Sequence, residues 1–298
     1  MSLTGSELKP STRSMATLIM QNFFKFREYF ANIPDARIYR KNQLSLIDTG
    51  IPVPNWNAII SNDSQLDGIL TNVEEYLSFF KLSCSFWLGP DQESSEPASI
   101  LKNHGFSPMG KSAAMALELT KIDTLHSPES ELKIVPVKSN RELEYYLRIL
   151  RHSYHLSQYA MDMLYGIFVR QDLKDDSVFY HYIGLLKGKP VGCASLFLAA
   201  GAAGIYYVGT LPDYRGRGIG KSMTTHCLKK AQEMNFRFAV LRASELGEPI
   251  YRKLGFLEYG HFRNFIRIIH PFINFGWKLR YYSKLVLDKF TGDAIWFS

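Results

Sequence analysis

The stretch that most constrains this chain is residues 205–220, with the sequence IYYVGTLPDYRGRGIG. An apolar run that favours a β-strand is followed by a turn and then by a glycine-rich segment that begins a helix. Backbone N–H groups in such a segment can turn toward a single anion, and the N-terminal end of the following helix adds a positive dipole. The segment therefore predicts a diphosphate-binding site, whose expected members are Arg215, Gly216, Arg217, Gly218, Ile219, Gly220 and Lys221.

Three kinds of nucleotide-binding motif place glycines before a helix, and their spacings differ. A P-loop requires a glycine where this chain has Arg215, and the dinucleotide fingerprint requires one where it has Lys221. The spacing that fits is R-x-x-G-x-G, formed by Arg215, Gly218 and Gly220. This pattern resembles motif A of the GNAT family of N-acetyltransferases.

Two neighbouring segments strengthen the resemblance. Residues 210–215, TLPDYR, are similar to the family's V-x-P-x-Y-R, with threonine in place of valine, and residues 251–256, YRKLGF, are similar to its Y-x-x-x-G-F. The resemblance implies an α/β fold of the α+β kind, with a mixed and mostly antiparallel sheet. It also implies acetyl-CoA as cosubstrate and a primary amine, of a small molecule or a protein, as acceptor.

The family's site residues can be placed on this chain by position. The resemblance implies that Tyr251 is the general acid that protonates the departing thiolate. The pantetheine arm is expected along the edge formed by Val208, Gly209 and Thr210, where one N–H group would polarise the thioester. Ser244 stands seven residues before Tyr251, where many members carry an asparagine that contacts the cofactor.

The general base has no such counterpart. Family members that use a glutamate on this strand place it four residues before Val208, and that position holds Gly204. Glu245, Glu248, Tyr206 or an ordered water are alternatives, and the base stays unassigned. The missing glutamate keeps open a second function, a non-catalytic acyl-CoA-binding or regulatory module.

The chain also contains an internal similarity. Residues 99–106, SILKNHGF, resemble residues 249–256, PIYRKLGF. At this constant offset, Ile100, Gly105, Phe106 and Gly110 recur as Ile250, Gly255, Phe256 and Gly260. With the similar order of strands and helices around them, the matches indicate two tandem GNAT folds.

The two halves differ where chemistry is expected. The first half has Leu101 in place of Tyr251 and lacks a glycine-rich cradle. We therefore expect a degenerate GNAT-like domain over residues 1–125 and an acetyl-CoA-binding domain with a C-terminal extension over residues 126–298, joined through a polar linker. The alternative is that the first half is an unrelated α/β domain.

Composition is consistent with two soluble cores and an anionic ligand. The 298 residues are 46% hydrophobic, which is enough for both domains, and the net charge of +7 is dispersed, so a nucleic-acid partner is not expected. Glycines at 201 and 204 split the uncharged run 190–212, which predicts a hairpin instead of a membrane span. The three cysteines are scattered, and His152 and His155 lack further ligands at metal spacing, so no disulfide, no metal and a cytoplasmic location are expected.

The tail beyond residue 265 exceeds what the fold needs. Trp277, Tyr281 and Leu285 would share one helical face among basic residues. Such a face suits a membrane surface, although packing against the neighbouring domain is the preferred interpretation.

Overall fold

The computed structural model describes residues 11–32, 36–41, 44–51, 53–61, 63, 69–70, 72–92, 96–121, 131–171, 173 and 177–269. The expected boundary at residue 125 and the helical face of the C-terminal tail lie outside these residues. Among the described helices, none is long and apolar enough to cross a membrane.

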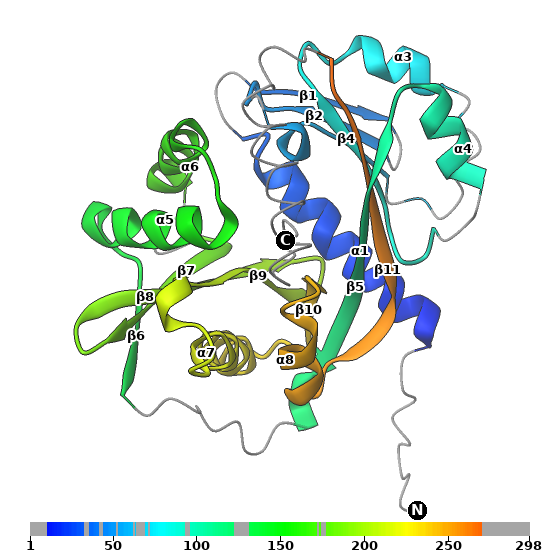
Figure 1. The fold of residues 1–298 in the computed structure, drawn as a ribbon. Helices are drawn as coiled ribbons and strands as arrows, with labels where there is room; N and C mark the ends of the chain where they lie inside the picture. Colours follow the sequence, from blue (N-terminus) through cyan, green and yellow to red (C-terminus); the bar gives the residue numbers. More distant parts are fainter. Residues whose placement is uncertain are drawn as a thin grey trace, which may run out of the picture.

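The described strands form one eleven-stranded sheet in the order β1-β2-β3-β4-β11-β5-β10-β9-β8-β7-β6 (Figure 1). The strands of the first half are β1 (Arg37–Lys41), β2 (Leu44–Asp48), β3 (Ala58–Ser61), β4 (Cys84–Leu88) and β5 (Ser107–Glu118). Those of the second half are β6 (Leu132–Pro136), β7 (Phe179–Leu186), β8 (Lys189–Ala199), β9 (Ala202–Thr210), β10 (Phe238–Ala243) and β11 (Leu257–Arg267). Only β3 with β4 and β9 with β10 pair in parallel among the described strands, so the expected mixed and mostly antiparallel sheet is confirmed.

The two halves exchange their last strands at the centre of the sheet. Strand β11, from the end of the second half, pairs with β4 through Phe265 opposite Phe86. Strand β5, from the end of the first half, pairs with β10 through Ala116 opposite Val240. Figure 1 shows β5 and β11 side by side between the halves, so neither half completes its own sheet.

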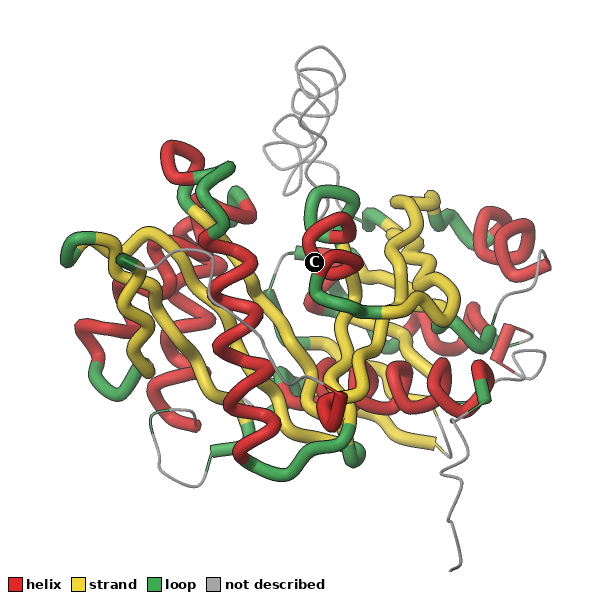
Figure 2. The backbone as a smooth tube through the Cα atoms, turned by 90° about the horizontal axis from the view of Figure 1, so that it is seen from below, coloured by secondary structure: helices red, strands yellow, loops and turns green. Residues whose placement is uncertain are grey.

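Helices cover both faces of this sheet (Figure 2). They are α1 (Thr12–Tyr29), α3 (Val73–Ser78), α4 (Glu96–Asn103), α5 (Asn140–Tyr154), α6 (Gln158–Gln171), α7 (Ile219–Glu233) and α8 (Glu248–Lys253), with short 3-10 turns η1 (Pro54–Trp56), η2 (Leu119–Lys121) and η3 (Pro212–Tyr214). Residues of α1, α5 and α6 share one hydrophobic core, whereas α7 and α8 pack in a second core with the opposite face of the second half. Helix α1 contacts strands of both halves and thereby joins them.

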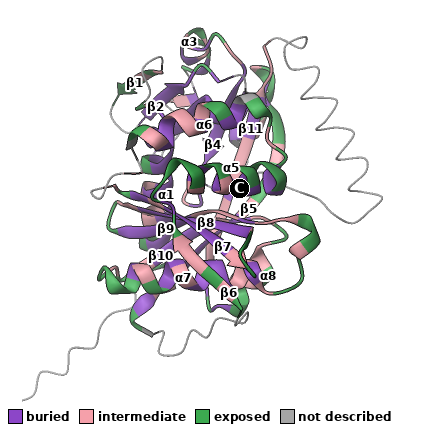
Figure 3. Ribbon diagram, turned by 90° about the vertical axis from the view of Figure 1, so that its left-hand side faces the viewer, coloured by how far each residue is buried: buried purple, intermediate pink, exposed green. Residues whose placement is uncertain are grey.

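Burial follows the alternation expected for a sheet covered on both sides. In the first half, Ile60 and Trp87 pack in the core that contains α1, whereas their neighbours Ile59 and Phe86 pack in a third core with α3 and α4. Figure 3 shows that the central strands are mostly buried and that the outer surfaces of the helices are exposed. Strands β8 and β9 form the predicted hairpin, which turns at Ala200 and Gly201 with φ of 53° and 75°.

The internal similarity recurs in backbone geometry. Positive φ angles occur at both members of each glycine pair: 81° at Gly105 and 93° at Gly255, 132° at Gly110 and 112° at Gly260. The two helix ends close in the same way, because the N–H of Phe106 donates to Leu101 at 3.0 Å and that of Phe256 donates to Tyr251 at 3.0 Å. Only glycine adopts such φ angles at no steric cost, which explains why these positions match in the sequence.

Candidate functional site

The glycine-rich turn lies at the end of β9 and opens α7. Gly216 and Gly218 adopt φ of 77° and 78°, and the first hydrogen bond of the helix joins the N–H of Ser222 to the carbonyl of Gly218 at 2.9 Å. Among the described residues, no acceptor is found for the N–H groups from Gly216 to Lys221. The turn therefore offers a row of open donors at a helix N-terminus, which is the arrangement expected of an anion cradle.

The cationic side chains beside this cradle are available to a ligand. Arg215 and Arg217 are exposed, and the only hydrogen bonds of their side chains to described residues are long ones of 3.5 Å to the carbonyls of Thr210 and Asp213. Neither these two nor Lys221 forms an ion pair with a carboxylate of the described residues. Each can therefore meet a phosphate without first breaking a salt bridge.

Strand β9 diverges from β10 just before the cradle. The two strands pair only at Ala203 and Gly204. Farther along, a β-bulge places residues 207 and 208 of β9 opposite a single residue of β8, and Tyr207 takes the left-handed φ of 53°. The bulge and the divergence open the sheet and leave one side of β9 without a neighbouring strand.

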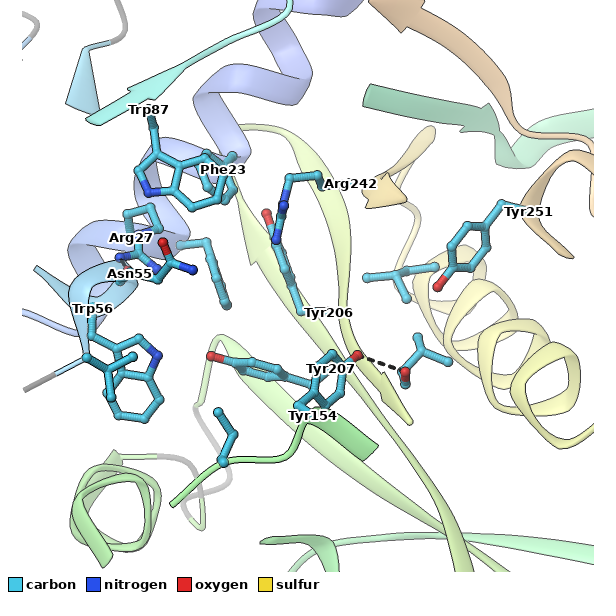
Figure 4. Close-up of a pocket in the computed structure, with 15 residues that line it drawn as sticks. Phe23, Arg27, Asn55, Trp56, Trp87, Tyr154, Tyr206, Tyr207, Arg242 and Tyr251 are labelled. Carbon is cyan, nitrogen blue, oxygen red and sulfur yellow. Dashed lines mark hydrogen bonds between the residues drawn. The ribbon is translucent and has the colours of Figure 1, made fainter. Parts of the chain in front are cut away.

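The expected oxyanion donors lie on this open side. The N–H of Leu211 donates to Val191 of β8 at 3.0 Å, so the N–H of Thr210 points the other way, because successive N–H groups of a strand alternate. The carbonyl of Val208 also faces away from β8, since it accepts a 2.8 Å hydrogen bond from the hydroxyl of Tyr154 (Figure 4). Gly209 allows α5 to approach, because a Cβ there would lie 2.7 Å from the Ser153 hydroxyl.

Tyr251 stands on α8 across from this opening. Its ring passes close over Gly247, where an added Cβ would lie 2.8 Å from the ring, and it packs edge-on against Phe256 with centroids 5.8 Å apart. Among the described residues its hydroxyl has no hydrogen-bond partner, and burial raises the pKa of the phenol well above its usual range. The hydroxyl of Ser244 accepts a hydrogen bond from the Gly247 N–H at 3.2 Å in the turn before α8, which leaves its own proton for a ligand.

A cavity between the two halves brings these groups together (Figure 4). Its lining consists of Phe23, Phe26, Arg27, Val53, Asn55, Trp56, Trp87, Tyr154, Leu156, Ile205, Tyr206, Tyr207, Val208, Arg242 and Tyr251. The predicted residues Val208 and Tyr251 therefore share one cavity, whereas the cradle residues lie outside its lining. Neither the wall from the first half nor Arg242 could be predicted from the sequence, because these residues belong to distant segments with no common motif.

The position of the missing glutamate is filled. A Cβ on Gly204 would lie 2.2 Å from the side-chain oxygen of Asn22, whose amide nitrogen donates to the carbonyls of Ala199 and Ala202 at 2.9 and 3.1 Å. The hydroxyl of Tyr206, another candidate base, donates to the same Asn22 oxygen at 2.9 Å, and burial raises its pKa. Helix α1 of the first half thus occupies the space that a glutamate would need.

The remaining candidate bases lie away from the cavity. Glu248 accepts a 2.8 Å hydrogen bond from Arg252, and Glu245 is exposed. Neither lines the cavity, and no aspartate or glutamate is found among its described lining residues.

Comparison with known proteins identifies the second half. Residues 143–256 match the sequence model of the Acetyltransferase (GNAT) family. This part of the chain is a GNAT domain. It contains most of α5, all of α6, α7 and α8, the cradle and Tyr251. No curated protein matches the chain.

Solved GNAT structures extend the likeness of fold to both halves. A GCN5-related N-acetyltransferase from Kribbella flavida is 17% identical, with a TM-score of 0.63 over 85% of this chain and 98% of its own. One from Sphaerobacter thermophilus is 14% identical, with a TM-score of 0.56 over 88% and 95%. A tandem GNAT protein from the clavulanic acid biosynthesis pathway is 12% identical, with a TM-score of 0.55 over 87% and 95%. Because each covers far more than residues 143–256, the tandem α/β architecture is shared beyond the family match.

Proposed function

We propose that this protein is an N-acetyltransferase that moves an acetyl group from acetyl-CoA to a primary amine. The observation that carries the proposal is the shared cavity of Val208 and Tyr251 at the point where β9 leaves β10. A thioester held along β9 would lie between a backbone donor and a phenol, as acetyl transfer requires.

The diphosphate of acetyl-CoA fits the cradle chemically. The open N–H groups from Gly216 to Lys221 and the exposed Arg215 and Arg217 are donors without described carboxylate partners. The cosubstrate supplies a thioester carbonyl, and the N–H groups of Val208 or Thr210 would stabilise the negative charge that develops on its oxygen. Charge-assisted hydrogen bonds of this kind contribute about 1.5–3 kcal/mol each.

The reaction then needs one proton donor and one neutral amine. The amine nitrogen forms a bond to the acetyl carbon and then loses one proton to water. The carbon–sulfur bond breaks, and the thiolate takes the proton of the Tyr251 hydroxyl. A raised phenol pKa keeps Tyr251 protonated at neutral pH, and a thiol pKa near 8.5 makes the thiolate a modest proton acceptor. Because Tyr251 gives up its proton in each turnover, it must take a new one from solvent.

The acceptor amine loses its proton to water, and the surroundings in the cavity favour this loss. The cavity has the guanidinium groups of Arg27 and Arg242 on its walls and no described carboxylate. Nearby positive charge and desolvation both disfavour an ammonium ion, so they favour loss of its proton to water.

A non-catalytic acyl-CoA-binding module is the second candidate, because the cavity supplies no carboxylate base among the described residues. Both candidates predict acetyl-CoA binding, whereas only the enzyme predicts release of free thiol in the presence of amines. Calorimetry with acetyl-CoA and a thiol-release assay over a broad amine panel would distinguish the two. Binding without turnover on any amine favours the module, and no binding contradicts both.

We also propose that the first half is a degenerate GNAT-like domain that shapes the acceptor side of the cavity. Arg27, Asn55 and Trp87 come from this half and line the cavity, whereas its Leu101 is fully buried in the core.

A further inference from the structure

Two arginine side chains from different halves meet in the cavity. Arg27 belongs to α1 and Arg242 to β10, and both guanidinium groups lie against the ring of Trp87, at 5.9 and 4.9 Å from its centroid. Arg242 also lies 6.0 Å from the ring of Phe23. Two positive charges therefore share one aromatic-walled space.

Burial makes the charge of Arg27 costly without an anion. Arg27 is 8% exposed, and burial lowers its pKa to about 10, with the charge of Arg242 adding to the effect. Burial likewise lowers the pKa of Arg242 to about 10, so both groups stay charged at neutral pH. No described lining residue is a carboxylate, and a cation as buried as Arg27 is expected to have an anionic partner.

Arg27 also retains hydrogen-bonding capacity. A terminal nitrogen of Arg27 donates to the backbone carbonyl of Asn55, but its Nε, buried from solvent, has no acceptor among the described residues. Arg242 donates from Nη1 to the Ser112 hydroxyl at 3.1 Å, which orients its guanidinium plane. These contacts fix the positions of the two groups, and the Nε of Arg27 remains a donor for a ligand.

Asn55 adds a third donor to the same wall. Its side-chain oxygen accepts a 2.7 Å hydrogen bond from Asn264, so the amide nitrogen is directed elsewhere and has no acceptor among the described residues. Figure 4 shows Arg27 and Asn55 on one side of the cavity, Tyr251 on the other side, and Arg242 between them. The cavity is thus cationic and donor-rich at one end and has the phenol at the other.

We propose that the acceptor is an amine that also carries a carboxylate, an amino-acid-like molecule whose carboxylate binds Arg27, Arg242 and Asn55. This inference rests on the proposed acetyltransferase function and specifies its substrate class. The planar fork of a guanidinium matches two carboxylate oxygens, and the rings of Phe23, Trp87 and Tyr206 suit an apolar or aromatic body between carboxylate and amine. A phosphate is less suitable, because a dianion with three oxygens would be poorly satisfied between aromatic walls.

Direct binding tests the carboxylate site independently of catalysis. The Tm of the full chain is measured with saturating CoA and increasing concentrations of phenylacetate, succinate or glutamate. Each acid is compared with its own amide under the same conditions. The carboxylates are expected to raise the Tm and the amides are not. Equal shifts for acids and amides, no shift for any acid, or a shift for phenyl phosphate alone would overturn the inference.

Substitution then assigns the binding to the two arginines. Arg27→Met and Arg242→Met keep side-chain bulk and remove the charge, and each is expected to weaken carboxylate binding at least about tenfold. Arg242→Lys keeps the charge without the fork and should restore only part of the affinity. The control is Arg141→Met, an exposed arginine on α5 outside the cavity lining, which should bind like the wild type. The Tm of each variant without ligand separates lost stability from lost binding, and unchanged carboxylate affinity in both cavity variants would contradict the assignment.

Turnover measurements distinguish failure of the carboxylate site from failure of the proposed acetyltransferase function, on which that site rests. With acetyl-CoA, phenylalanine is compared with phenylalaninamide, and glutamate with its diamide, by thiol release. The acid of at least one pair is expected to exceed its amide at least about tenfold in kcat/KM, chiefly through a lower KM, and to lose this advantage in Arg27→Met. If amines without a carboxylate are acetylated equally well, the function stands and the carboxylate inference fails. If acetyl-CoA does not bind at all, the proposed function fails.

Discussion

The two halves of the molecule share a strand, a helix and a strand, but the helix and the phenylalanine that follows it have different surroundings in each half. In the first half, Leu101 on α4 is fully buried and packs with Phe106. In the second half, Tyr251 on α8 is half-buried, packs against Phe256 and faces the cavity. The same backbone, with the same positive φ angles at its glycines, thus supports a closed core in one half and an open site in the other.

The difference arises from what surrounds the segment. In the second half β9 leaves β10 after Gly204 and ends in the glycine cradle. In the first half, β3 stays beside β4 over the described residues and no such cradle follows in the sequence. A shared frame therefore need not carry the same chemistry, which we propose to depend on the divergence of two parallel strands and on one hydroxyl.

The strongest test of this contrast is Tyr251→Phe. Removal of one hydroxyl that has no described partner should leave the Tm unchanged and lower kcat by about 10²–10⁴. Since burial raises the phenol pKa, loss of wild-type activity through deprotonation of this acid should appear only above pH 10, the ordinary tyrosine range. Steady-state kinetics and thermal unfolding on one preparation check both points, and a stable variant within threefold of wild-type kcat would remove Tyr251 from the mechanism.

The paired substitutions Phe106→Ala and Phe256→Ala test the shared frame. Both rings are 2% exposed, so each truncation should lower the free energy of unfolding by about 3–5 kcal/mol. Only Phe256→Ala should also reduce kcat, because that ring supports Tyr251. Urea unfolding and turnover are measured for both, and equal loss of kcat in the two variants would mean that the halves are not specialised as described.

Gly218→Asp tests whether the cradle belongs to one half alone. A carboxylate at the helix N-terminus would repel the diphosphate, so the affinity for acetyl-CoA should fall at least about 100-fold. The wild-type protein should bind one acetyl-CoA per chain. The matched control is Gly188→Asp, because both glycines have φ of 78° and residue 188 lies in the exposed turn between β7 and β8. Calorimetry checks affinity and stoichiometry, and two equivalents per wild-type chain would contradict a single cradle.

Leu101→Tyr has the smallest expected effect. Leu101 is fully buried, so the larger ring should destabilise the fold by about 1–3 kcal/mol. It should create no second activity, because the first half has no glycine cradle in its sequence. A rise in kcat above that of wild type, in the same thiol-release assay, would show that only the hydroxyl separated the two halves.

Local parts of this structure could be predicted from the sequence, whereas the pairing of the halves could not. The cradle and Tyr251 lie in short motifs whose residues are neighbours in the chain, and glycines at positive φ identify the repeat. The exchange of β5 and β11 depends on contacts between strands that are far apart in the sequence, and such contacts produce no motif with a fixed residue spacing. Arg27 and Arg242 meet for the same reason, since α1 and β10 are brought together only by the folded sheet.

The bulge at Tyr207 could not be predicted from the sequence either. Left-handed backbone favours glycine, and nothing in a tyrosine within an apolar run indicates φ of 53°. At position 204 the sequence indicates only that a glutamate is missing, and the structure gives the physical reason, which is the close approach of Asn22.

The exchanged strands have a consequence for the handling of this chain. If the first half were deleted, β10 would lose β5 and expose an unpaired edge at the centre of the present sheet, a surface prone to aggregation. Strand β11 would lose β4 and β5 together. The second half therefore depends on the first for the pairing of its own strands, and a gene that begins at β6 should yield insoluble protein instead of a minimal enzyme.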